Sequence, residues 1–137
     1  MPEQKTRPTK ESVAAFLKRA TDGDLRTDSA TIVRMLQKAT GARGVMWGRG
    51  IVGFGLQDIA YADGRTAEWP IIAFAPRKQH LTLYISRRLD GLDVLLGKLG
   101  KHKMSGGCLH IKRLSDVDMA VLSKVIARSV KATTSKS

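Results

Sequence analysis

The feature that most constrains this fold is a segment whose side chains alternate between apolar and polar. Its apolar positions are Leu81, Leu83 and Ile85, and its polar positions are His80, Thr82, Tyr84 and Ser86. Successive side chains of a β-strand point to opposite faces of the sheet, so this period of two predicts a half-buried antiparallel strand. Residues 108–112 repeat the pattern around Leu109 and Ile111. If these two strands are neighbours, one sheet face carries Thr82, Tyr84, His110 and Lys112.

Four other segments show the spacing of amphipathic helices, with apolar residues three and four positions apart. Their apolar stripes are Val13, Phe16, Leu17 and Ala20; Ile32, Val33, Leu36 and Ala39; Leu89, Leu92, Leu95, Leu96 and Leu99; and Val117, Val121, Leu122, Val125 and Ile126. We expect Thr9 or Ser12 to cap the first helix and Ser115 to cap the last. Residues 22–24 should break the first helix, and the second should start near 28–29.

Glycine marks several of the remaining boundaries. Gly41 is expected to end the second helix and Gly100 the third. Five glycines in residues 44–55 predict a loop followed by a strand in which the backbone bends or is closely approached. Residues 62–65 have the composition of a hairpin turn, and residues 69–75 read as a mostly apolar strand.

The resulting order is α-α-β-β-β-α-β-α. It predicts an α+β fold, in which an antiparallel sheet of about four to five strands has helices packed on one face. A chain of 137 residues is most simply one domain. We expect that domain to span residues 10–130, with mobile tails at 1–9 and 131–137.

Composition indicates the cellular compartment to expect. The single cysteine, Cys108, excludes an internal disulfide and suits a reducing cytoplasm. The N-terminal residues contain no apolar run, so no signal peptide is expected. No stretch approaches the roughly 18–20 apolar residues that cross a membrane, so we also expect no membrane association through a spanning helix.

The positive charge is concentrated in one window of the chain. Residues 77–113 contain nine Lys and Arg against Asp90 and Asp93, which gives +7 of the formal +12, and they contain all three histidines. Such a patch predicts an anionic small molecule or an acidic partner. Nucleic acid is a weaker prediction, because Tyr84 is the only aromatic residue expected on the polar face, where bases would need to stack.

Three chemical alternatives lie in the same window. Cys108 and His110 share a strand face, so a thiolate–imidazole pair and a cysteine-dependent enzyme are conceivable. The three histidines match no compact zinc spacing, and the surrounding cations would repel a metal ion, so no metal site is assigned. Residues 106–107, with Lys101 and Lys103, could form a backbone anion-binding nest. No cofactor is expected.

The sequence also resembles a known family. The matching segments are Trp69-Pro70, Phe74-Ala75-Pro76-Arg77-Lys78-Gln79-His80-Leu81-Thr82-Leu83-Tyr84, Leu99-Gly100-Lys101-His102-Lys103, Gly107-Cys108-Leu109-His110-Ile111-Lys112-Arg113-Leu114 and Asp116-Val117-Asp118. They look like the YdhG-like domain of unknown function, over roughly residues 10–130 and most strongly over 69–118.

The resemblance implies a compact α+β domain with an antiparallel sheet, and most of that family has no assigned activity. One branch resembles frataxin-like iron chaperones, which hold iron with acidic surface residues. This chain is basic and lacks an acidic ridge, so iron binding is not carried over to any residue. An iron chaperone remains an alternative function.

The sequence therefore predicts a non-enzymatic cytoplasmic binding protein that holds an anion through a basic sheet face. No catalytic residue is assigned. The candidate ligand-binding residues are Arg77, Lys78, His80, Tyr84, Lys101, His102, Lys103, His110 and Lys112. Whether His80, His102 and His110 converge, and whether Cys108 is reactive, are questions for the structure.

Overall fold

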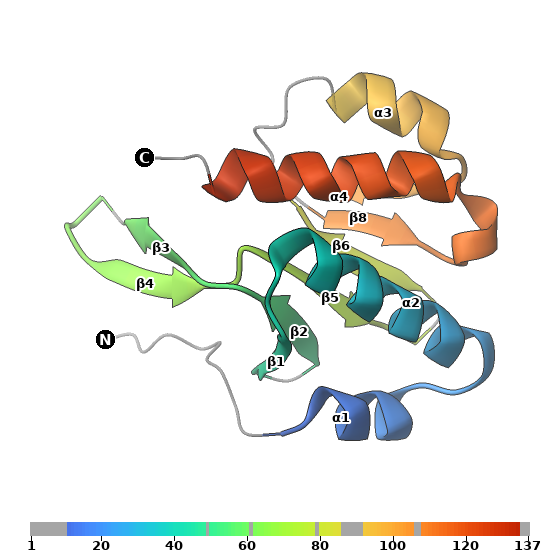
Figure 1. The fold of residues 1–137 in the computed structure, drawn as a ribbon, viewed down its shortest axis with the longest axis horizontal. Coiled ribbons are helices and arrows are strands. Elements are labelled where there is room, and N and C mark those ends of the chain that lie inside the picture. Colours follow the sequence, from blue (N-terminus) through green and yellow to red (C-terminus); the bar gives the residue numbers. More distant parts are fainter. Residues whose placement is uncertain are drawn as a thin grey trace.

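The computed structural model describes residues 11–48, 50–60, 62–78, 80–85, 92–105 and 108–134. Figure 1 shows how its helices and strands are arranged. The helices are α1 (Val13–Ala20), α2 (Gly23–Thr40), α3 (Leu92–Leu99) and α4 (Met119–Thr134), with a short 3-10 helix, η1 (Leu114–Asp116). The strands are β1 (Gly44–Trp47), β2 (Ile51–Phe54), β3 (Gln57–Ala60), β4 (Thr66–Trp69), β5 (Ile72–Pro76), β6 (Leu81–Tyr84), β7 (Lys103–Ser105) and β8 (Cys108–Ile111).

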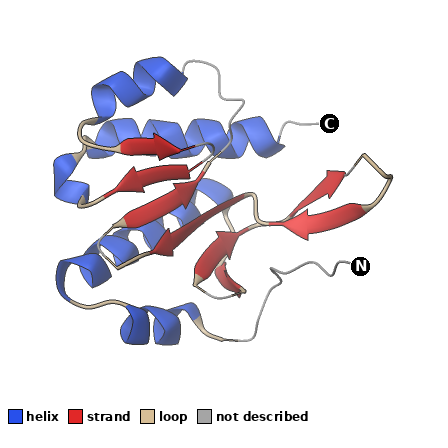
Figure 2. Ribbon diagram, turned by 180° about the vertical axis from the view of Figure 1, so that it is seen from behind, coloured by secondary structure: helices blue, strands red, loops and turns tan. Residues whose placement is uncertain are grey.

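Six of these strands form one antiparallel sheet in the order β1-β2-β5-β6-β8-β7. Strands β3 and β4 pair separately, as a hairpin that projects beyond the main sheet in both views (Figures 1 and 2). The helices lie behind the main sheet when it is seen as in Figure 2, which leaves its other face uncovered by helices. The predicted α+β class is confirmed, with an antiparallel sheet and helices on one face.

The sheet has more strands than the four to five expected, for reasons that are visible in the chain. Residues 44–47, expected to be a loop before a strand, form the edge strand β1 and pair with β2. The predicted strand 69–75 is split at Pro70, which has no N–H to donate to a sheet ladder, and its first residue belongs to the separate β3–β4 hairpin. Residues 103–105, for which the sequence predicts no strand, form the edge strand β7 and pair with β8.

One helix boundary is as predicted, and two differ from expectation. Ser12 caps α1, since its hydroxyl accepts a hydrogen bond from the Ala15 N–H at 2.9 Å. Helix α2 begins at Gly23 rather than near 28–29, so the predicted break at 22–24 is only a short junction after α1. Asp118, not Ser115, caps α4: its carboxylate accepts from the N–H groups of Ala120 and Val121.

The remaining boundary predictions have mixed outcomes. Gly41 ends α2 with φ of 71°, a backbone conformation that favours glycine, and α3 ends immediately before Gly100. Helix α4 continues to Thr134, beyond residue 130, where we expected the domain to end. Leu89 and the predicted tail residues 1–9 and 135–137 lie outside the described residues.

The apolar sides of β6 and β8 form the centre of the core, as the alternation predicts. Leu81, Leu83, Leu109 and Ile111 are fully buried, and Ile85 is nearly so. They belong to one cluster with the apolar stripes of α2 and α4, which supply Ile32, Leu36, Leu122, Val125 and Ile126. Each side chain of this size that leaves water stabilises the fold by about 1.5–3 kcal/mol.

The uncovered face of the sheet has two different halves. Over β1, β2 and β5 it is filled by aromatic side chains: Trp47 is only 1% exposed, and its ring lies 5.8 Å from that of Trp69. Gly53 makes this packing possible, because a Cβ there would lie 2.5 Å from Pro70 Cγ and 2.6 Å from Trp47 Cδ1. Over β6, β8 and β7 the same face stays polar. We call this polar half the open face.

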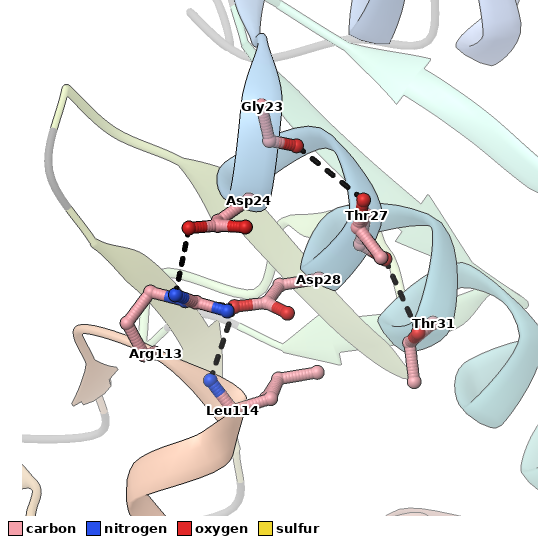
Figure 3. Close-up of polar contacts among 7 residues, drawn as sticks. All are labelled: Gly23, Asp24, Thr27, Asp28, Thr31, Arg113 and Leu114. Carbon is pink, nitrogen blue, oxygen red and sulfur yellow. Dashed lines mark hydrogen bonds and ion pairs between the residues drawn. The ribbon is translucent and has the colours of Figure 1, made fainter.

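An ion pair ties the end of β8 to helix α2 (Figure 3). The Asp28 carboxylate, whose side chain is 9% exposed, accepts hydrogen bonds from Arg113 Nε at 3.0 Å and from the Leu114 N–H at 3.1 Å. Arg113 also donates from Nη1 to the exposed carboxylate of Asp24 at 2.9 Å. Arg113 follows Lys112 directly, so this contact fixes the chain where it leaves the open face.

Replacing Asp28 with alanine should lower the free energy of unfolding by about 1–3 kcal/mol, because the buried Leu114 N–H loses its acceptor. Asp24→Ala is the matched control: it removes the other carboxylate paired with Arg113, but an exposed pair contributes only about 0–1 kcal/mol. Denaturant unfolding of both variants measures the difference. Equal losses would show that the burial of Asp28 does not matter.

Candidate functional site

Strand register places the candidate side chains in rows across the open face. Directly opposite residues of antiparallel strands share a face, with Cβ atoms about 4.5–5.5 Å apart. Thr82 pairs with His110, which pairs in turn with Lys103. The next row contains Tyr84, Cys108 and Ser105. Strands β6 and β8 are neighbours, which is the condition for one shared polar face, and β7 extends this face with a lysine and a serine.

His80 and His110 are in ring contact. Their ring centroids are 5.3 Å apart and their planes meet at 71°, an edge-to-face arrangement. His110 Nδ1 is 3.0 Å from the hydroxyl oxygen of Thr82, which is 3% exposed. A threonine hydroxyl can donate or accept, so it satisfies His110 Nδ1 whether or not that nitrogen carries a proton.

His102 is held in another way. Its Nδ1 lies 2.8 Å from the carbonyl oxygen of Gly100. A carbonyl oxygen only accepts, so Nδ1 must be the donor, and in the neutral ring Nε2 is left as an acceptor. The hydrogen bond fixes both the tautomer and the orientation of the ring.

Two open concavities lie on this face, and the histidine pair is common to both. The first, of about 550 Å³, is lined by His80, Lys101, His102, Lys103, Ser105, His110 and Lys112. The second, of about 650 Å³, is lined by Arg77, Lys78, His80, Thr82, Tyr84, Cys108 and His110. All nine candidate residues therefore line one concavity or the other. His80, His102 and His110 converge on the first.

The electrostatic character of both concavities is cationic. The side chains of Lys101, Lys103 and Lys112 are exposed, and Arg77 donates from Nη2 to the Tyr84 hydroxyl at 2.9 Å. No Asp or Glu is among the described residues that line either concavity. An anion entering here would meet several positive charges and no competing carboxylate from those residues.

The surroundings disfavour a proton on His80. Burial lowers the pKa of His80, and the neighbouring His110 and the Arg77 guanidinium lower this pKa further. Each of these effects destabilises the imidazolium relative to the neutral ring. A negative charge placed against the histidine pair would oppose the contributions of His110 and Arg77.

Three residues of the site were not among the nine candidates. Thr82 and Cys108 were placed on the polar strand faces but given no binding role, and Ser105 was missed because β7 was not foreseen. The pairing of Ser105 with Cys108 could have been found by extending a hairpin across the glycines at 106–107. The anion-binding nest proposed at those two glycines lies outside the described residues.

Within the described part of the chain, no three His, Cys, Asp or Glu side chains gather as they would around a metal ion. The described helices include none that is both long enough and apolar enough to cross a bilayer.

Comparison with protein-family models, with curated proteins and with solved structures found no match for this chain. The resemblance to the YdhG-like family therefore stays a prediction, carried by the sequence segments quoted for it.

The lowered pKa of His80 predicts how stability varies with pH. When a histidine has a lower pKa in the folded state, the unfolded chain binds more protons. The folded state should therefore lose stability as the pH falls through the ordinary histidine pKa of about 6.5. Thermal or denaturant unfolding between about pH 8 and pH 5.5 measures this slope.

His80→Gln should flatten that slope, because glutamine does not titrate. His102→Gln is the matched control, since it removes a histidine that makes no ring contact with the pair. A slope unchanged in His80→Gln, relative to the wild type, would contradict the assignment to His80.

Proposed function

We propose that this chain is a small, non-enzymatic binding protein that holds an anionic ligand on its open face. The observation that carries the proposal is the first concavity, which three lysines, three histidines and Ser105 line with no carboxylate among its described residues. Cations that repel one another in free solution are held together here by the strands β6, β7 and β8. An anion is the ligand that lowers the electrostatic energy of such a group.

The shape favours a small ligand over a macromolecule. Pockets for small molecules usually measure about 300–1,000 Å³, and both concavities fall within that range. Nucleic-acid binding faces normally add exposed aromatic rings on which bases stack. Tyr84 is the one aromatic side chain among the described lining residues, and its hydroxyl is already hydrogen-bonded to Arg77.

The resemblance to the YdhG-like family names no activity for this chain, since most of that family has none assigned. Its iron-chaperone branch suggests a different ligand. Iron sites of that kind use several acidic oxygens, whereas the described lining residues here are cationic or neutral. The open face therefore favours an anion over a metal cation, and a reducing cytoplasm remains the expected setting.

Reversing the charge of two lysines tests the proposal. The double variant Lys101→Glu/Lys103→Glu should bind inorganic sulfate, phosphate or tripolyphosphate at least about tenfold more weakly, because attraction becomes repulsion at short range. Isothermal titration calorimetry at matched low ionic strength measures the affinities, since salt would screen the effect.

The control is Lys38→Glu/Lys124→Glu. It changes the net charge equally but places both substitutions on exposed positions of α2 and α4, on the helical side of the sheet (Figure 2). This variant should retain wild-type affinity within about twofold. The proposal is wrong if both double variants lose the same affinity, or if none of the three anions binds the wild-type protein.

A further inference from the structure

The histidine pair lies where the two concavities meet, so it can contact a ligand that occupies either one. His80 comes from the turn that precedes β6, and His110 comes from β8. Their rings are 5.3 Å apart between centroids. At that separation, the first proton on the pair raises the cost of the second.

The charged and titratable groups around the pair come from every neighbouring segment of this face. They are Arg77 and Lys78 before β6, Tyr84 on β6, Lys101, His102 and Lys103 at β7, and Cys108 and Lys112 at β8. None of these described neighbours is a carboxylate that could neutralise an imidazolium. In the free protein, burial and the neighbouring His110 and Arg77 therefore disfavour a proton on His80.

A bound anion changes the free energy of protonating the histidine pair. It supplies the negative charge that the lining residues lack, so it makes protonation of the pair favourable. By linkage, the protons must in turn strengthen the binding of the anion.

Resting on the proposed function, we propose that the ligand is a tetrahedral oxyanion of the phosphate or sulfate class, and that it binds with uptake of protons by His80 and His110. The site then fills as the pH falls and empties as it rises.

A tetrahedral oxyanion fits this donor set better than a carboxylate does. The donors approach from different directions: the two imidazoles from the turn before β6 and from β8, Lys103 and Ser105 from β7, and Lys101 and Lys112 from the adjoining turns. A planar carboxylate has two oxygens and one charge. A phosphate or sulfate dianion has acceptors in three dimensions and a second charge, which matches a pair that gains up to two protons.

Thr82 lets the pair change charge without local rearrangement. Its hydroxyl can donate to a neutral His110 Nδ1, or rotate and accept from a protonated one, at the same 3.0 Å separation. Because Thr82 is buried, it holds the His110 ring in place in both states. His110 Nε2 is then the ring nitrogen that remains to meet a ligand.

Sulfate is the sharper probe, because it stays a dianion throughout the range in which histidine titrates. The affinity of sulfate for the wild-type protein should rise at least about fivefold for each unit by which the pH falls from 7.5 to 6. Binding coupled to the uptake of one full proton would raise the affinity about tenfold per pH unit. Inorganic phosphate should follow the same rise less steeply below about pH 7, because phosphate itself then becomes a monoanion. Glycerol phosphate, measured beside inorganic phosphate, distinguishes an esterified ligand from a free one.

Two variants distinguish the effect of the histidine pair on sulfate binding from the effect of the surrounding lysines. In His80→Gln/His110→Gln, sulfate affinity should vary less than about twofold over the same pH range. In Lys112→Gln, sulfate should bind more weakly at every pH, with the wild-type slope retained, because the lysine stays charged throughout. Calorimetry of the wild-type protein in two buffers of different ionisation enthalpy counts the protons taken up, independently of whether any variant folds.

Measured proton uptake of at least about 0.7 proton per sulfate at pH 6.5, the uptake that a fivefold change per pH unit requires, supports the inference. Sulfate binding with no proton uptake, or a slope unchanged in the double histidine variant, overturns it and leaves the proposed function standing. If neither sulfate nor phosphate binds at any pH between 5.5 and 8, the inference and the proposed function both fail.

Discussion

In β6 and β8, each residue that faces the helices is followed by one that faces away, and the antiparallel pairing of these strands aligns the two alternations. Leu81 lies opposite Ile111 and Leu83 opposite Leu109, all fully buried. The same register sets Thr82 opposite His110 on the open face. A shift of one residue in the strand register would exchange the two faces. Burial of the leucines in the core therefore also fixes the position of His110 on the open face.

The open face is held at its borders by two further packing arrangements. Asp28 on α2 binds Arg113 and the Leu114 N–H just beyond β8, which anchors the segment that carries Lys112. At the other end of the sheet, Trp47 packs over Gly53 and against Trp69. These aromatic rings cover the half of the sheet face over β1, β2 and β5. Among the described strand residues of this face, polar side chains are therefore in contact with solvent only on the half over β6, β7 and β8.

Strand alternation and helical spacing were enough to predict the fold class and the buried residues of β6 and β8. They could not reveal β7, since Lys103 and Ser105 are exposed at a sheet edge and no apolar period marks them. They could not reveal the Asp28–Arg113 pair, because 85 residues separate the partners. The contact between His80 and His110 was equally hidden: His80 precedes its strand, and only the turn before β6 sets where its ring lies.

Mapping of an anion on the protein by NMR tests the central claim most directly. Sulfate titrated into isotope-labelled protein at low ionic strength should shift backbone amide signals in residues 80–84, 101–105 and 108–112. Signals from α2 and the middle of α4, across the core, should stay in place. Shifts concentrated on those helices, or no shifts at all at millimolar sulfate, would contradict the assignment of the open face as an anion-binding surface.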